Sequence, residues 1–275
     1  MIPNATIVTC IITLFVTLIL PVVLMAVYAS KNKGRQILSA WLLGAAGFFV
    51  TQILIRVPIL TFLQSKSWFQ AFASGHLFLY AFTLAFTAGL FELAGRFSVA
   101  KLMQKNLNYK RSLAAGLGHG SIEAMLLVGM TYINNLIYIF MIRSGAFDTV
   151  IAQTATAGVD VTQLYAIQDA LISTSPALFL MAGFERILAM TGHVGMSMVV
   201  CYGIHTNKPL QASLICLGIH TLLDLTAGIN LLAGSVLSQT TAYIIIYAIL
   251  IDAALLSLRI VHTIRSRWPE KEVSL

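Results

Sequence analysis

Residues 118–124, GHGSIEA, place a histidine and a carboxylate inside a long apolar run of the chain. His119 and Glu123 are four residues apart, so on a helix they project from the same face. A charged side chain at the centre of a bilayer costs at least about 2.5 kcal/mol, and membrane helices rarely carry one without a partner or a function. This stretch therefore predicts a membrane helix with a functional polar face.

Composition indicates the same class of protein for the whole chain. Of the 275 residues, 58% are hydrophobic and only 10% are charged, and the mean hydropathy is +0.87. A water-soluble domain of this size does not reach such values. We therefore expect an all-α, polytopic membrane protein in which residues 1–275 form a single transmembrane domain, a seven-helix bundle. The expected spans, each longer than the roughly 20 residues that cross a bilayer, are 6–29, 37–62, 69–93, 113–141, 176–204, 210–232 and 236–261.

The basic residues predict the orientation of these spans. Only Lys66 and Arg143 fall on one side, whereas the other side collects most of the Lys and Arg residues, including Lys31, Lys33, Arg35, Arg96, Lys101, Lys105, Lys110, Arg111, Lys208, Arg259, Arg265, Arg267 and Lys271. Basic loops stay in the cytoplasm, so we expect the N-terminus outside and the C-terminus in the cytoplasm. The net charge of +7 is explained by this topology signal, and no nucleic-acid partner is expected. Arg56, near the end of the second span, is expected to extend to the headgroups.

The longest connection, residues 144–175, is then extracytoplasmic. Its charged residues are acidic. Within it, residues 160–171 (DVTQLYAIQDAL) have the pattern of a short amphipathic helix with Asp160 as the N-cap and Gln163 in capping-box spacing.

Four spans bring ionisable side chains to a similar depth. At about 1.5 Å of rise per residue, these side chains lie about 14–22 Å from the cytoplasmic ends of their helices. The residues of this layer are Glu92, His119, His193 and His220. Glu123 and Asp224 follow one helical turn after His119 and His220, and the small residues Gly118 and Gly120 let the neighbouring helices approach His119. Three histidines and three carboxylates exceed what helix packing needs, and they predict a site where water is activated or a metal is bound.

Four stretches resemble a known family. FELAGRF, GLGHGSIEA, FERILAMTGHVGMS and GIHTLLDL, in this order and at these spacings over roughly residues 89–228, resemble the YhfC family of bacterial membrane proteins. That family is grouped with the type II CAAX prenyl endopeptidases, the PrsW proteases and the anterior pharynx-defective subunit of γ-secretase. The resemblance implies an intramembrane protease of the bacterial cytoplasmic membrane, with a glutamate and histidines around an activated water.

The first family motif is a Glu pair followed by Arg. By this resemblance Glu92 is the catalytic glutamate and Arg96 its ion partner. The chain departs from the motif because only one Glu of the pair is present, which makes Glu123 a second candidate for the base.

The other motifs carry the histidines. His119 matches the histidine of the second motif, His220 with Asp224 matches an HxxxN or HxxxD motif, and His193, with Ser197 one turn later, resembles the remaining histidine. Glu185 and Arg186 are adjacent supporting residues, which we expect in the outer half of the bundle.

Peptide hydrolysis needs a nucleophile, a proton acceptor and a group that stabilises the oxyanion. We expect Glu92 or Glu123 to act as general base while His119 orients the water. His220, Asp224 and His193 would bind the carbonyl oxygen or support the groups that do. This glutamate route requires no cofactor. A Zn²⁺ version would use His119, His193 and His220 as ligands, but the chain has no HExxH or HxE motif.

Two other functions use the same residues. A non-catalytic scaffold subunit of a membrane complex would need them for assembly, and a proton-coupled transporter would use the carboxylates as a relay. The chain lacks the paired broken helices that many transporters show. The expected partners are membrane lipid and a peptide or membrane-protein substrate, whereas the sequence leaves the identity of the substrate and the oligomeric state open.

Overall fold

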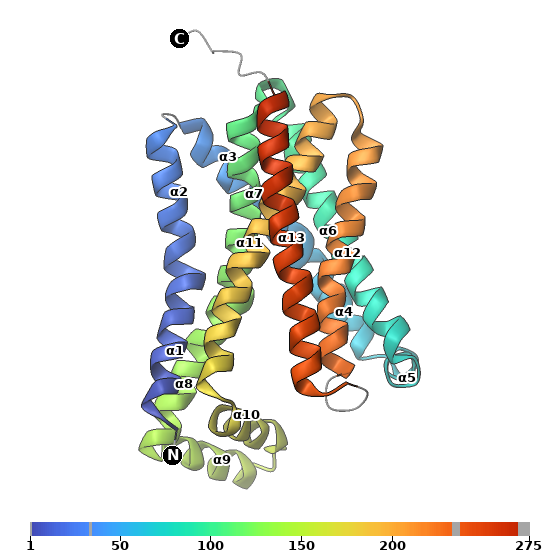
Figure 1. Cartoon of the computed structure of the whole chain (residues 1–275). Helices are drawn as coiled ribbons and strands as arrows, with labels where there is room; N and C mark the ends of the chain where they lie inside the picture. Colours follow the sequence, from blue (N-terminus) through green and yellow to red (C-terminus); the bar gives the residue numbers. More distant parts are fainter. Residues whose placement is uncertain (1, 33–34, 233–236, 269–275) are drawn as a thin grey trace. The chain divides into compact units, whose positions relative to one another are not determined.

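The computed structural model describes residues 2–32, 35–232 and 237–268 (Figure 1). Within them, seven helices are long and apolar enough to cross a membrane, which confirms the predicted all-α, multi-pass class. They are Asn4–Lys31, Gln36–Gln64, Leu77–Leu102, Tyr109–Ser144, Pro176–His205, Pro209–Asn230 and Gln239–Arg267. Lys33 and Lys271, two of the basic residues that predict the orientation, lie outside the described residues.

Three of the long helices contain a π-helical segment. Phe15–Ile19 joins α1 (Asn4–Leu14) to α2 (Leu20–Lys31), Phe49–Arg56 joins α3 (Arg35–Phe48) to α4 (Val57–Gln64), and Ala124–Gly129 joins α7 (Tyr109–Glu123) to α8 (Met130–Ser144). Such segments are frequent at functional sites because they turn side chains away from the α-helical register. The remaining long helices are α6 (Leu77–Leu102), α11 (Pro176–His205), α12 (Pro209–Leu232) and α13 (Gln239–Arg267).

The third span begins later than the expected 69–93. Ser67–Gly75 forms a separate short helix, α5, and His76, with φ −136° and ψ 57°, breaks the helical path before α6 starts at Leu77. Gly75, a poor helix former, precedes the break. As a consequence Glu92 and Arg96 lie in the interior of α6 and not at the end of a span.

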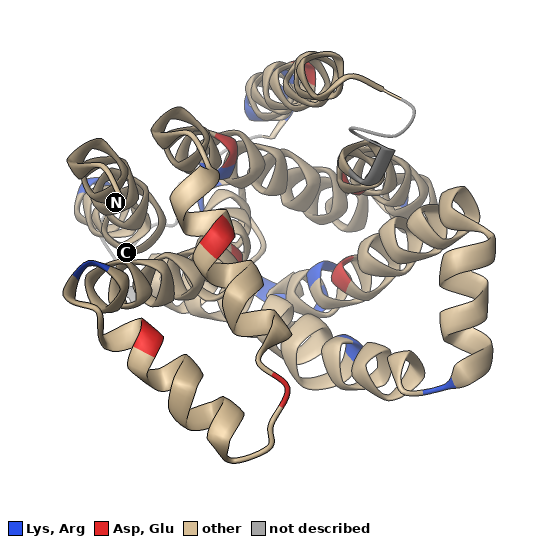
Figure 2. Cartoon of the chain, turned by 90° about the horizontal axis from the view of Figure 1, so that it is seen from below, with Lys and Arg blue, Asp and Glu red and all other residues tan. Residues whose placement is uncertain are grey.

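The connection at 144–175 holds two short helices where the sequence predicts one. They are α9 (Ala146–Thr156) and α10 (Thr162–Ser173), and the acidic residues of this connection are seen in Figure 2. Asp160 precedes α10 by two residues, and its Oδ1 accepts hydrogen bonds from the backbone N–H and the hydroxyl of Thr162 at 2.9 and 2.6 Å. The N-cap itself is Val161. These two hydrogen bonds lower the pKa of the Asp160 carboxyl below its ordinary value.

The chain packs as two compact units. The first unit comprises Met1–Val23 and Ala124–Ile187, and the second comprises Leu24–Glu123 and Leu188–Leu275. In the first, α1 packs against α8 around a core that includes Cys10 and Phe179. In the second, α3 packs against α7 and α6 against α12. The whole predicted layer of glutamate and histidines belongs to the second unit.

Close backbone approach in the second unit depends on the glycines beside His119. A Cβ at Gly118 would lie 1.9 Å from the carbonyl oxygen of Trp41 on α3, and a Cβ at Gly120 would lie 3.0 Å from Cα of Met190 on α11. A larger residue at Gly118 would therefore overlap the backbone of α3. This packing explains how His119 comes close to residues on two neighbouring helices.

Candidate active site

Glu92 lies at the centre of a buried cluster and is only 4% exposed. Its Oε2 accepts a hydrogen bond of 3.0 Å from Nη2 of Arg96, one turn later on α6. The same oxygen lies 2.9 Å from Nε2 of His119 on α7 and 2.7 Å from Nε2 of His220 on α12. One carboxylate oxygen thus joins groups from three helices.

The second oxygen of Glu92 is held by a residue that the sequence reasoning missed. Gln52, in the π-helical segment Phe49–Arg56, donates from Nε2 to Oε1 of Glu92 at 2.9 Å. The Oε1 of Gln52 in turn accepts from Nη1 of Arg56 at 3.3 Å, and Nη2 of Arg56 donates to the carbonyl of Leu84 at 2.7 Å. Arg56 therefore bonds to groups inside the unit, and the expectation that it extends to the headgroups is wrong. The available signal was a polar Gln four residues before an Arg in an apolar run.

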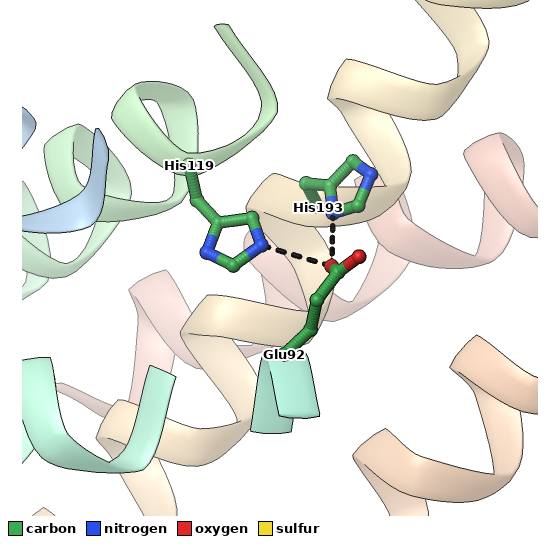
Figure 3. Close-up of side chains that lie close together, drawn as sticks. All are labelled: Glu92, His119 and His193. Carbon is green, nitrogen blue, oxygen red and sulfur yellow. Dashed lines mark hydrogen bonds and ion pairs between the residues drawn. The ribbon is translucent and has the colours of Figure 1, made fainter. Parts of the chain in front are cut away.

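His193, on α11, connects Glu92 to the second glutamate. Its Nδ1 lies 2.5 Å from Nη2 of Arg96 and 3.7 Å from Oε2 of Glu92, and its Nε2 lies 2.5 Å from Oε2 of Glu123. Figure 3 shows Glu92 between the imidazoles of His119 and His193. These two rings stack with centroids 5.3 Å apart.

His220 forms a second pair with a carboxylate. Its Nδ1 lies 3.4 Å from Oδ2 of Asp224, one turn later on α12. The side chain of Asp224 is 36% exposed, whereas that of His220 is 3% exposed. Two carboxylate–imidazole pairs, Glu123–His193 and Asp224–His220, therefore flank Glu92.

The structure thus brings together all six residues predicted as catalytic, and Arg96 with them. Ser197 lines a small cavity that Arg96 and His119 also border. Glu185 and Arg186 belong to the first unit, where they form an ion pair with each other. The roles of these residues in catalysis stay predictions.

The chemistry of the buried donors fits a metal ion. Glu92, His119 and His193 each offer one ligand atom, and these three atoms lie within 4.8 Å of one another. Two imidazoles and one glutamate are a ligand set of catalytic zinc sites. The predicted third ligand was His220, and in this group Glu92 takes its place. Because Nη2 of Arg96 lies against both Glu92 and His193, an ion could bind there only if the guanidinium moved aside.

The formal charge of the Glu92 cluster also favours a bound cation. The groups in contact with one another include three carboxylates and the guanidinium of Arg96, and the guanidinium of Arg56 reaches Glu92 through Gln52, so one negative charge remains when the imidazoles are neutral. Uncompensated charge is costly inside a membrane protein. A protonated imidazole or a bound cation would balance it.

Comparison with known proteins gives a family. A family model described as YhfC intramembrane metalloprotease matches residues 16–252. The uncharacterized membrane protein YhfC of Bacillus subtilis (strain 168) is 30% identical over 182 residues, which cover 66% of this chain and 69% of that protein. No solved structure matches the chain.

Proposed function

The chain belongs to the YhfC intramembrane metalloprotease family, and we propose that it hydrolyses a peptide bond in or near the membrane at the Glu92 cluster. The observation that carries this proposal is the arrangement around one carboxylate oxygen, where Arg96, His119 and His220 lie within 3.0 Å of Oε2 of Glu92. Packing alone does not need so many ionisable groups at one buried point.

Glu92 is the general base in this proposal. Its Oε1 accepts a hydrogen bond from Gln52, and a carboxylate oxygen has a further lone pair for a water proton. The water oxygen attacks the peptide carbonyl carbon as Glu92 takes its proton. Glu123, which contacts His193 at 2.5 Å, orients that imidazole.

His220 returns the proton. Its Nε2 lies 2.7 Å from Glu92 and its Nδ1 faces Asp224, so the imidazole lies between a buried carboxylate and a partly exposed one. An imidazole in such a position can act as both acceptor and donor of protons. We assign it the transfer to the leaving amine, which completes cleavage of the C–N bond.

The donor set also supports a metal form of the site. Glu92, His119 and His193 would hold a zinc ion, which would polarise the peptide carbonyl as a Lewis acid. With Glu92 engaged as a ligand, Glu123, whose Oε2 lies against His193, is the carboxylate that remains to accept the proton. Glu123 is therefore needed in either form, as an orienting group in one and as the base in the other.

The setting of the reaction follows from topology. We place the protein in a bacterial cytoplasmic membrane with its C-terminus in the cytoplasm, a proposal supported by the basic loops and by the bacterial relative. The substrate is then a peptide or a membrane protein that reaches the layer of Glu92.

A comparison of protein termini tests the proposal. Cells that express the wild type or Glu92→Gln are labelled at free N-termini, and new termini in membrane proteins are sought by mass spectrometry in water enriched in ¹⁸O. We expect wild-type-specific termini whose matching C-terminal carboxylates carry ¹⁸O, and none with Glu92→Gln. Asp252→Asn, the same kind of change at an exposed position of α13, is the matched control and keeps the activity. The same termini with Glu92→Gln would refute the assignment of Glu92.

A further inference from the structure

A small cavity lies beside the Glu92 cluster within the second unit. Its volume is about 10 Å³, which is close to the minimum that holds one water molecule. The polar part of its lining comes from Arg96, His119 and Ser197, and the apolar part includes Val99, Ala115 and Cys201. The cavity is thus polar enough and large enough for a single water.

Arg96, which lines this cavity, has N–H donors without a hydrogen-bond acceptor in the part of the chain that the structure describes. The residue is 3% exposed, and its Nη2 contacts Glu92 and His193. Its Nε and Nη1 are buried and have no hydrogen-bond partner among the described residues. A guanidinium stays charged and can only donate, and a buried donor without an acceptor costs about 1–3 kcal/mol or more. An oxygen atom in the cavity would remove this cost.

We propose that the cavity binds one water molecule through Arg96, and that the hydrolytic water is drawn from this site. This inference rests on the proposed function and adds the place where the water is held. The guanidinium that would bind the water also donates to Oε2 of Glu92, and His119 borders both the cavity and the carboxylate. The water is therefore stored one side chain away from its proton acceptor.

A peptide carbonyl oxygen of the substrate could accept the same hydrogen bonds from Arg96 as a water molecule. The test therefore contains no substrate, so that only water can act as the acceptor. X-ray hydroxyl-radical footprinting of the full chain in nanodiscs generates radicals from bound water, and these oxidise adjacent sulfur atoms. Cys201 lines the cavity and is 2% exposed, whereas Cys10 and Cys216 are fully buried and do not line it. We expect Cys201 to be oxidised at least tenfold faster than the other two.

A substitution that fills the cavity tests whether its water takes part in the reaction. Val99→Ile adds one methylene to the lining, and Val200→Ile makes the same change at a buried position that does not line the cavity. We expect Val99→Ile to lower Cys201 oxidation to the level of Cys10 and to lower kcat at least tenfold with KM unchanged, on a substrate identified from the termini. Val200→Ile should change neither, and both variants should melt within a few degrees of the wild type.

Two results would overturn the inference. One is a wild-type Cys201 that is oxidised no faster than Cys10, a measurement that needs no variant. The other is a Val99→Ile protein that loses the Cys201 signal and keeps its kcat, because the water would then be structural. Absence of any hydrolysis by the wild type would instead defeat the proposed function, and footprinting without substrate is independent of that outcome.

Discussion

Replacement of Gln52 by Leu removes a donor to Oε1 of Glu92 with little change in side-chain volume. Gln52 is buried, and its Nε2 lies 2.9 Å from that oxygen. A hydrogen bond to a charged group contributes about 1.5–3 kcal/mol. If the whole amount is lost from the positioning of the base, kcat falls by about 10- to 150-fold, at about 1.4 kcal/mol per tenfold change. Because Gln52 contacts Glu92 and is not assigned to the substrate, KM should change by less than about threefold.

The assay is the initial rate of cleavage at several substrate concentrations by protein purified in nanodiscs, well below the melting temperature of each variant. Gln211→Leu, the same replacement at an exposed position of α12, is the control and should leave both constants unchanged. A fall in kcat of less than twofold, or a rise in KM with an unchanged kcat, would refute the positioning role of Gln52.

Three further outcomes follow from the geometry. Arg96→Gln removes the cation that lies against two of the three metal-ligand atoms, so zinc affinity measured by calorimetry should rise at least tenfold, and a fall would show that Arg96 does not compete with the ion. Gly118→Ala places a Cβ 1.9 Å from a carbonyl oxygen of α3 and should destabilise the protein by about 1–3 kcal/mol or more. Gly218→Ala, where a Cβ would meet no atom within 4 Å, is the control and should not destabilise it. Equal melting temperatures of the two variants would contradict this expectation. Hydrogen bonds lower the pKa of the Asp160 carboxyl below its ordinary value of 3.8, so its stabilising effect is present above the unfolded pKa and is lost as the pH falls through the folded pKa. Protection of the Thr162 amide, corrected for intrinsic exchange, should therefore drop as the pH falls below 3.8 in the wild type and show no such drop in Asp160→Asn.

The number of long apolar helices could be predicted from the sequence because the cost of burying polar backbone in lipid leaves few alternatives. The break at His76 could not, because it depends on one backbone conformation within an apolar run. Helix α9 was also missed. Its Thr and Val residues are poor helix formers, and the burial of Phe147 and Ile151 against the rest of the first unit stabilises it.

The members of the site were predictable because charge stands out in an apolar run, and helical rise sets depth. Glu92 and His119 could be predicted from these two properties. The rotation of each helix about its axis could not be predicted, and this rotation directs Nδ1 of His193 toward Arg96 and Nε2 toward Glu123. Gln52 escaped notice because a neutral amide in a span is less conspicuous than a charge.

The pairing of Glu92 with Arg96 on one helix also bears on how the protein is made. His119, the first histidine that contacts Glu92, follows it by 27 residues and His220 follows it by 128, so at about 5–20 residues per second the ribosome needs about 1–5 s to reach the first and about 6–26 s to reach the second. Before His119 is made, an isolated carboxylate in the bilayer would cost about 2.5–3.5 kcal/mol. Arg96, four residues later, is synthesised within about a second and can neutralise Glu92 as soon as α6 forms. Arg96 therefore has a role before any catalysis. It lowers the cost of inserting the third span into the membrane until the spans that carry the histidines have been synthesised.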